Sequence, residues 1–575
     1  MSDSPVPNTT APATTAPAHA AAATAPAHAA AATVSRTGGR GIPLSPAQQA
    51  ALLPERLRGV AATNLFLALE ITGDLDPAGL DRAAVAAVSR HDILRTVYPD
   101  DRRIPYQRVV DAPETVVETV ETASSALDAA LRSDAAHRID PVRELPIRIR
   151  LHRTPGRDIL SITAHPVAAD DRSLELLAAE VAGRTTAEPV TQYRGYAMAQ
   201  MKSLVADAAT DPDLGYWLDR LADLPERATL IAPGNSGADS EPAASATRTL
   251  RVPEAAFGDR DIELSVVAAL AAVLGAAGLG GDVPVGIVDA GRAGAQYNSA
   301  LGAYANHLVL RIDTGAAPTA RALLEQVAEL AVAARAHAAA RIERITHQLR
   351  GAAAVAAGAP FQALVTVRSE VSGPNAREIA RRVARPHGVD VVADVVTGAE
   401  EVAVTLEFPA ALAGSAEIDA LSSGIERWLL NVAGEPETAP REDELPTVFE
   451  RNGASAGGTG LGGKPGTDAE RLIADTIREV LELDEDDDIG RADTFFSLGG
   501  DSIAALRMVT LLGERGYVLD VQKVFEFPAV HDMAAQLTEA AAAPAAEQSA
   551  PVAPMSASGL DPAALAALGK KFAAR

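Results

Sequence analysis

The segment DTFFSLGGDSIAALRM, residues 493–508, places a serine directly after a two-glycine turn and at the start of an apolar-periodic helix. This arrangement predicts an exposed hydroxyl on Ser502. No histidine lies close by in the sequence and no strand–turn–helix elbow is predicted, so a self-activated serine nucleophile is poorly supported. An ordinary helix N-cap serine behind a glycine turn would explain the same residues. The role of Ser502 therefore has to be judged from the unit around it.

The sequence around Ser502 predicts a small helical unit of roughly 70 residues. Upstream, Thr467 and Glu470 have the spacing of a capping box, and apolar residues follow on one helical face. A second helix is expected to begin at Ser502 and to end at Gly516, and a third falls within residues 529–540. Short helices of this kind bury their apolar faces against one another, which predicts an all-α bundle.

The whole unit, residues 467–540, resembles the peptidyl carrier domain of nonribosomal peptide synthetases. The resemblance rests on the LGGDS core that ends at Ser502 and on FEFPAV at residues 525–530. It implies a four-helix carrier bundle in which Ser502 is the attachment point of 4′-phosphopantetheine. The terminal thiol of that arm holds an amino acid or peptide as a thioester, and so supplies a thiol that this cysteine-free chain lacks.

A larger α/β region precedes the carrier unit. Helical and alternating-strand patterns intermix over residues 40–432, and a polar break at 234–246 predicts two lobes, of about 40–230 and 245–432.

Several segments of this region are similar to nonribosomal peptide condensation domains. They are PLSPAQQA at 43–50, residues 73–98, residues 193–200, Tyr216-Trp217, DAGR at 289–292 and LGAYANHLVLR at 301–311. The resemblance implies two chloramphenicol-acetyltransferase-like lobes that form a V with a tunnel between them. Within these segments Arg95 and Asn306 are expected to be structural.

The central motif of that family is altered in this chain. The family joins an acceptor amine on one carrier to a donor thioester on another, through a His-His-x-x-x-Asp-Gly motif whose second His sits at the reaction centre. Here ILSITAHPVAADDRS aligns His165 with the first His and Asp170 with the Asp, whereas Pro166 replaces the second His and Asp171 the Gly. His165 and Asp170 are therefore the candidate catalytic residues of a degenerate motif.

Proline has neither a side-chain donor or acceptor nor a backbone N–H, so Pro166 can neither take a proton nor orient an amine. A shifted alignment keeps a His at the centre by matching His165 to the second His. It then replaces the Asp by Ala169 and loses the match at Ser173, so the first alignment is preferred. The HPxxxDD pattern also resembles the HRxxxDD of glycopeptide-type relatives that recruit oxidising enzymes.

Two hypotheses follow for the function. In the first, the chain is a synthetase component that carries a tethered aminoacyl or peptidyl group, loaded in trans, and its condensation-like domain is catalytically impaired or serves as a scaffold or recruitment platform. In the second, it is an active condensation enzyme that forms an amide or ester without the second His. A lost general base typically costs about 10²–10⁴ in rate, and positioning of a nucleophilic amine could compensate for part of this.

The composition excludes several other classes of function. The 575 residues include 51 Lys and Arg against 76 Asp and Glu, a formal charge of −25, so nucleic acid is not an expected partner. The absence of cysteine excludes disulfides and thiolate sites, and no His/Asp/Glu spacing suggests a metal site. No signal peptide or 18-residue apolar run without a charge, glycine or proline is found, which predicts a cytoplasmic protein without membrane partners.

The remaining segments are predicted to be tails and tethers. Residues 1–39 form an Ala/Pro/Thr tract that is expected to be disordered, while 433–466 and 541–557 have the composition of flexible linkers. Residues 558–575 suit a short amphipathic helix, which we hypothesise docks in a partner's groove.

The linker leaves no room for an adenylation domain. The expected partners are therefore a stand-alone adenylation enzyme, a phosphopantetheinyl transferase, and upstream and downstream synthetase modules or tailoring enzymes.

Overall fold

The structure is a computed structural model. It describes residues 42–58, 62–183, 190–204, 211–231, 246–349, 358–434, 445–450 and 463–539. Breaks inside these ranges fall at 74, 102–105, 226, 318, 374, 410–411, 413–414, 482, 484–488, 492, 496–497 and 499–501. The predicted N-terminal tail, the second linker and the C-terminal helix lie outside the described residues.

The first lobe is built on a six-stranded sheet. Its strand order is β13 (Ser372–Gly373), β14 (Ala376–Arg382), β2 (Leu65–Ile71), β7 (Arg157–Ala164), β6 (Ile147–Thr154) and β5 (Val117–Glu121). Helices α2 (Pro77–Arg90) and α4 (Asp171–Val181) share one core with the sheet, and α3 (Leu127–Ala136) covers the other face.

The sequence of β2, LFLALEI, explains why both faces of this sheet are covered. Successive side chains of a strand point to opposite faces. Leu65, Leu67 and Leu69 accordingly enter the core with α2 and α4, whereas Phe66 and Ala68 enter the core with α3.

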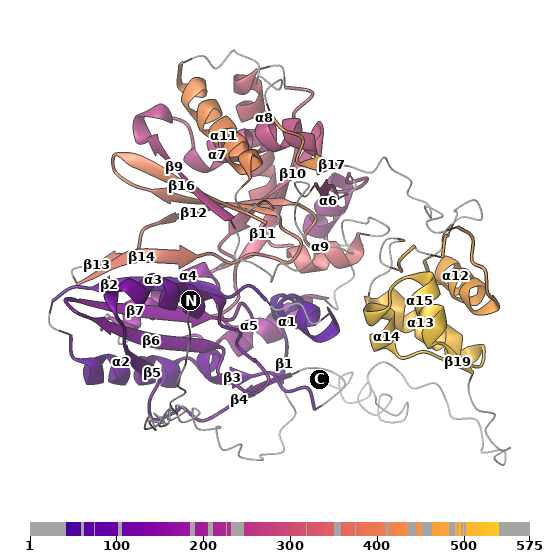
Figure 1. Cartoon of the computed structure of the whole chain (residues 1–575), viewed down its shortest axis with the longest axis horizontal. Coiled ribbons are helices and arrows are strands. Elements are labelled where there is room, and N and C mark those ends of the chain that lie inside the picture. The colour runs from indigo at the N-terminus through magenta and orange to yellow at the C-terminus, as the bar shows by residue number, and fades with distance from the viewer. Residues whose placement is uncertain are drawn as a thin grey trace, which may run out of the picture.

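The second lobe has its own six-stranded sheet. Its order is β11 (Asn306–Asp313), β10 (Asp282–Asp289), β12 (Ala363–Ser369), β15 (Val391–Thr397), β16 (Glu401–Phe408) and β9 (Ala246–Pro253). Helices α7 (Ile262–Leu274), α8 (Ala320–Ala336) and α11 (Ala416–Gly434) pack with this sheet in a single core. The predicted α/β class with two lobes is confirmed (Figure 1).

Helix α7 and the π-turn that follows it form an 18-residue stretch, Ile262–Leu279, that is apolar enough to cross a membrane. It is the one such helix among the described residues, and 67% of it is buried inside the fold. Every residue of α7 from Ser265 to Leu274 is buried. Its composition is therefore that of the lobe's central core helix.

Shorter elements connect and border the two lobes. They are β1 (Ile42–Pro43), α1 (Pro46–Arg58), η1 (Asp92–Arg95), β3 (Thr96–Val97), β4 (Tyr106–Val109), η2 (Ser124–Ala126), α5 (Tyr193–Leu204), α6 (Pro212–Arg220), β8 (Thr229–Leu230), η4 (Glu254–Ala256), η5 (Gly275–Leu279), η6 (Ala295–Tyr297), α9 (Ile342–Gln348) and β17 (Phe449–Glu450).

The chain crosses between the lobes more often than the predicted ranges allow. Strand β14 lies in the range assigned to the second lobe, yet it pairs antiparallel with β2 of the first (Figure 1). Residues 300–304 also enter the core of the first lobe, through Ala300, Leu301 and Tyr304. The two lobes are thus joined by an exchanged strand as well as by side-chain contacts.

The predicted linker at 433–466 is partly structured. Helix α11 ends at Gly434, and further on β17 pairs with β8 while Val448 and Phe449 are fully buried in the core of the second lobe. Val448 and Phe449 alone form too short an apolar pattern to predict a strand. This part of the stretch therefore belongs to the second lobe.

The carrier unit contains α12 (Asp468–Leu481), α13 (Ser502–Glu514), α14 (Val521–Glu526) and α15 (Val530–Gln536), with a short pairing of β18 (Tyr517–Val518) and β19 (Thr538–Glu539). The predicted capping box is formed, because Glu470 N–H donates to Thr467 Oγ1 at 3.1 Å and Thr467 N–H donates to Glu470 Oε2 at 3.3 Å. Helix α14 contacts α1 of the first lobe.

Candidate functional site

His165 lies at the end of β7, where the chain leaves the sheet of the first lobe. Its side chain is 1% exposed. The Val167 N–H donates to Nδ1 at 3.1 Å, and Nε2 lies 3.3 Å from Glu55 Oε2 on α1. Because Nδ1 accepts a backbone N–H, the imidazole is the tautomer that carries its proton on Nε2 and donates it to Glu55.

The Glu55 carboxylate is held in its charged form by these contacts. Burial alone would raise its pKa, but the hydrogen bonds from His165 and from the Ala62 N–H together lower that pKa. An ionised Glu55 keeps the proton on Nε2 of His165. Both ring nitrogens of His165 are thus engaged within the protein, and neither is free to accept a proton from a substrate amine.

Pro166 stands at the position that the resemblance assigns to the catalytic His. It is partly exposed, between the buried His165 and the buried Val167. A histidine here would present a second imidazole next to that of His165. Proline presents only ring carbons, so this position supplies no general base.

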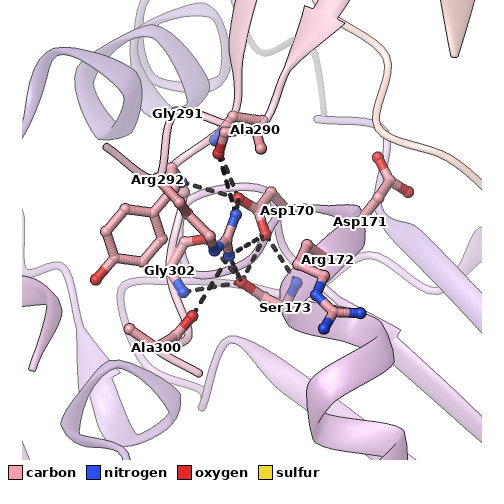
Figure 2. A network of polar contacts seen from close by, with 12 residues as sticks. Asp170, Asp171, Arg172, Ser173, Ala290, Gly291, Arg292, Ala300 and Gly302 are labelled. Carbon is pink, nitrogen blue, oxygen red and sulfur yellow. Dashed lines mark hydrogen bonds and ion pairs between the residues drawn. The ribbon is translucent and has the colours of Figure 1, made fainter. Parts of the chain in front are cut away.

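Asp170 is the centre of a buried polar network (Figure 2). It is the N-cap of α4, where Oδ1 accepts the Ser173 N–H at 2.8 Å and the Ser173 hydroxyl at 2.6 Å. The guanidinium of Arg292 donates to both carboxylate oxygens, at 2.8 and 2.9 Å. The backbone N–H groups of Tyr304 and Ala305 complete the coordination of Oδ2.

The Asp170–Arg292 pair joins the two lobes. Each side chain is 5% exposed, and Arg292 follows β10 of the second lobe whereas Asp170 precedes α4 of the first. Gly291 makes this approach possible, because it has φ +62° and a Cβ there would lie 1.8 Å from the Tyr304 carbonyl oxygen. Every lone-pair direction of Asp170 is occupied, so its role in this geometry is structural.

Asp171, the residue in place of the family's glycine, has fewer partners. Its Oδ1 lies 3.6 Å from the Arg381 guanidinium, and its Oδ2 accepts the Ala384 N–H at 3.2 Å. Burial raises the pKa of Asp171 to about 6, although the positive charge of Arg381 opposes that rise. Figure 2 shows its side chain turned away from the Asp170–Arg292 network.

Arg341 is a structural residue of the site that sequence reasoning did not identify. It forms a bidentate ion pair with Glu343 and donates to the Tyr196 hydroxyl and to the carbonyls of Tyr304 and Ala305. It therefore fixes the backbone whose N–H groups bind Asp170. The carbonyl partners are set by the fold, so a sequence pattern could not have revealed this role.

The two residues expected to be structural have that role. The Arg95 guanidinium donates to the Val110 carbonyl and pairs with Asp92. The Asn306 amide donates to two carbonyls and its Oδ1 accepts two backbone N–H groups. Among the residues that the structure describes, no group of three or more His, Asp or Glu could hold a metal ion.

A cavity of about 600 Å³ adjoins Asp170 and Asp171. Its walls come from the N-terminal part of α4, from α7, from the end of β10 and from residues 366–372. Volumes of this size accommodate small-molecule ligands.

Ser502 is the first residue of α13, a helix of 13 residues. The N-terminal end of a helix carries partial positive charge and free N–H groups, which favour a bound phosphate. Downstream in the helix, Ala505, Met508 and Leu512 enter the carrier core. The position of Ser502 therefore fits a phosphopantetheine arm.

Comparisons with known families agree with both parts of the fold. The model of the condensation domain matches residues 40–452, and that of the phosphopantetheine attachment site matches residues 471–537. The architecture of two acyltransferase-type lobes followed by a carrier bundle defines the class of protein. The chain belongs to the condensation-domain family, and it has the condensation and phosphopantetheine carrier domains of nonribosomal peptide synthetases.

Curated relatives are synthetases of much greater length. A probable non-canonical nonribosomal peptide synthetase, CymA, of Salinispora arenicola is 34% identical over 52% of this chain and 4% of its own length. The dimodular nonribosomal peptide synthase of Bacillus subtilis is 29% identical over 57% of this chain and 15% of its own. The isonitrile lipopeptide synthase of Mycobacterium tuberculosis is 31% identical over 51% of this chain and 13% of its own length. The chain spans only a small part of each relative.

Solved structures share the fold. The X-domain from teicoplanin biosynthesis superposes with a TM-score of 0.59 at 24% identity, over 72% of this chain and 99% of that one. The first condensation domain of the calcium-dependent antibiotic synthetase superposes with a TM-score of 0.58 at 21% identity, over 70% of this chain and 98% of that one. The predicted chloramphenicol-acetyltransferase-like lobes are confirmed by these neighbours.

Proposed function

We propose that this chain presents an aminoacyl or peptidyl group tethered through 4′-phosphopantetheine to Ser502, and that its condensation-like domain is catalytically impaired. The single observation that carries the proposal is the state of the altered motif. Pro166 has no proton acceptor, and both ring nitrogens of His165 are engaged by Val167 and Glu55. The motif thus lacks an imidazole that can deprotonate an acceptor amine.

The condensation-like domain then acts as a scaffold or recruitment platform. The Asp170–Arg292 pair and the Arg341–Glu343 pair hold the loops of the two lobes together. A rigid platform of this kind can position a tethered group without transforming it. The arm itself supplies the thiol that binds the acyl group.

We place the loading of Ser502 in trans. Only residues 453–470 separate the two family matches, which is far too short for an adenylating domain. A stand-alone adenylation enzyme and a phosphopantetheinyl transferase are the proposed partners, together with upstream and downstream modules or tailoring enzymes in the cytoplasm. Residues 558–575 are proposed to dock on one of them, so their deletion should slow transfer to that partner while phosphopantetheinylation continues.

Intact-mass measurement tests the carrier role. The full chain, incubated with coenzyme A and a broad-specificity transferase, should gain the mass of one phosphopantetheine arm, and the Ser502→Ala variant should gain none. Addition of a candidate adenylation enzyme with its amino acid and ATP should then add the aminoacyl mass. Modification of the Ser502→Ala variant would contradict the assignment.

The alternative is an active condensation enzyme that works by positioning alone. The cavity beside Asp170 and Asp171 favours it, because the space next to the altered motif is large enough for a substrate. Amide or ester formation between a donor-loaded carrier and an acceptor on Ser502 would support this alternative. The reaction should then survive His165→Ala, since His165 takes no proton.

A further inference from the structure

The cavity beside α4 is lined by both lobes. Asp171 and Glu175 come from α4 of the first lobe, and Glu263 comes from the first turn of α7 in the second. Residues 366–372, which include the end of β12, complete the wall and contribute Glu370. A ligand in this cavity would therefore be in reach of carboxylates from both lobes.

The arginines of the cavity wall are already neutralised by carboxylates. Arg292 pairs with Asp170 through two hydrogen bonds. Arg368 pairs with Asp394 and with Glu378, each at 2.8 Å. These two guanidinium groups are at least nine-tenths buried, so their positive charge is held within the protein.

Arg172, the third arginine of the wall, has a side chain that is 54% exposed and lies 2.9 Å from Glu175. Water screens an exposed pair of this kind strongly. Arg172 therefore contributes little positive potential to the interior of the cavity.

The carboxylates are less completely neutralised. Asp171 has its cationic partner, Arg381, at 3.6 Å, beyond hydrogen-bond distance. Burial raises the pKa of Glu263 despite its pairing with Arg335, and burial raises that of Asp171 to about 6. Glu370 lies exposed at the wall, where water weakens its charge as it weakens that of Arg172, so Asp171 and Glu263 contribute most. The cavity thus retains negative charge that a bound cation would offset.

Part of the remaining wall is apolar, with Leu176, Val288, Val371 and Val383 among its residues, and Thr366, Ser369 and Ser372 add hydroxyl groups. We propose that this cavity binds the side-chain ammonium of a lysine-like aminoacyl or short peptidyl group, with its alkyl part against the apolar part of the wall and its positive charge near Asp171, Glu263 and Glu370. The inference rests on the proposed function, because it assigns a substrate class to the domain that receives the tethered group.

Titration calorimetry on the full chain with three matched probes tests the inference. The probes are the N-acetylcysteamine thioesters of Nα-acetyl-lysine, Nα-acetyl-norleucine and Nα-acetyl-glutamate, which differ in the end of the side chain. The lysine probe should bind at least about tenfold more tightly than the norleucine probe, as a charge-assisted contact provides. The glutamate probe should bind most weakly.

Two variants locate the effect. Asp171→Asn should remove most of the preference for lysine over norleucine, and Glu370→Gln, at an exposed position, should reduce it. Asp468→Asn is the matched control, because this carboxylate is 99% exposed on α12 and lies outside the cavity wall. The ratio of affinities for the lysine and norleucine probes should be the same in this control as in the unaltered chain.

Several results would overturn the inference: equal affinity for lysine and norleucine, tighter binding of glutamate, no binding of any probe, or a preference that persists in both cavity variants. The proposed function fails separately, by the absence of a phosphopantetheine mass gain at Ser502. Lysine-selective binding by a chain that cannot be modified would leave the cavity assignment standing and remove the carrier role.

Discussion

Removal of the Asp170 carboxylate should destabilise the contact between the lobes more than any change at an exposed charge. The Asp170→Ala variant would leave the Arg292 guanidinium, 5% exposed, without its ion-pair partner. It would also remove the acceptor of the Tyr304 and Ala305 N–H groups. Breaking a buried ion pair from one side typically costs about 3–5 kcal/mol, because the remaining charge is buried and uncompensated.

Urea denaturation measures this cost. Trp217 and Trp428 are both buried in the core of the second lobe, so tryptophan fluorescence reports that lobe while circular dichroism reports the whole chain. With a urea dependence of about 2–3 kcal/mol per molar, the midpoint should fall by about 1–2 M. The control Arg172→Ala removes an exposed pair with Glu175 on the same helix and should change stability by less than about 1 kcal/mol.

The double variant Asp170→Ala with Arg292→Met separates pairing from other effects. Replacement of both partners leaves no buried charge, so it should be clearly more stable than Asp170→Ala alone. A single variant that loses less than about 1 kcal/mol, or a double variant whose loss is the sum of the two single losses, would refute the assignment of Asp170 as a structural charge.

Further changes test the other parts of the structure. As pH rises from 3.8 through the raised pKa of about 6, ionisation of Asp171 should lower the free energy of unfolding by up to about 3 kcal/mol, and Asp171→Asn should remove this loss. Denaturation curves at pH 4 and pH 7 measure the loss, and the same pH dependence in the unaltered chain and the variant would contradict it. Glu470→Ala should cost the carrier about 1 kcal/mol by opening the capping box, measured by thermal unfolding against Glu470→Gln. Phe449→Ala should cost the second lobe about 3–5 kcal/mol, and a smaller change would show that β17 is not part of that core.

Much of the carrier unit could be predicted because its signals are local, but the short helix α14 (Val521–Glu526) was not predicted from its residues. The capping box of Thr467 and Glu470 spans four residues, and the helix that begins at Ser502 follows directly from its apolar spacing. Such features depend on neighbours in sequence, so one sequence suffices to place them.

Contacts between distant residues could not be predicted in the same way. The His165–Glu55 contact joins positions 110 residues apart, and β14 crosses to the sheet of the first lobe. Nothing in the sequence of either segment specifies its partner, because the His165–Glu55 contact forms only when the first lobe has folded and the β14–β2 pairing only when the two lobes are assembled. The engagement of both nitrogens of His165 was visible only in the structure, and it sharpens the interpretation of Pro166.

In the proposed function, the altered motif lacks an imidazole general base. Single-turnover reconstitution tests this most directly, with a donor-loaded carrier, an acceptor amine loaded on Ser502, and product detected by mass spectrometry. We expect no product above the uncatalysed rate for the unaltered chain, and a gain in rate of about 10²–10⁴ when Pro166→His restores an imidazole. Rapid product formation by the unaltered chain that His165→Ala abolishes would contradict it.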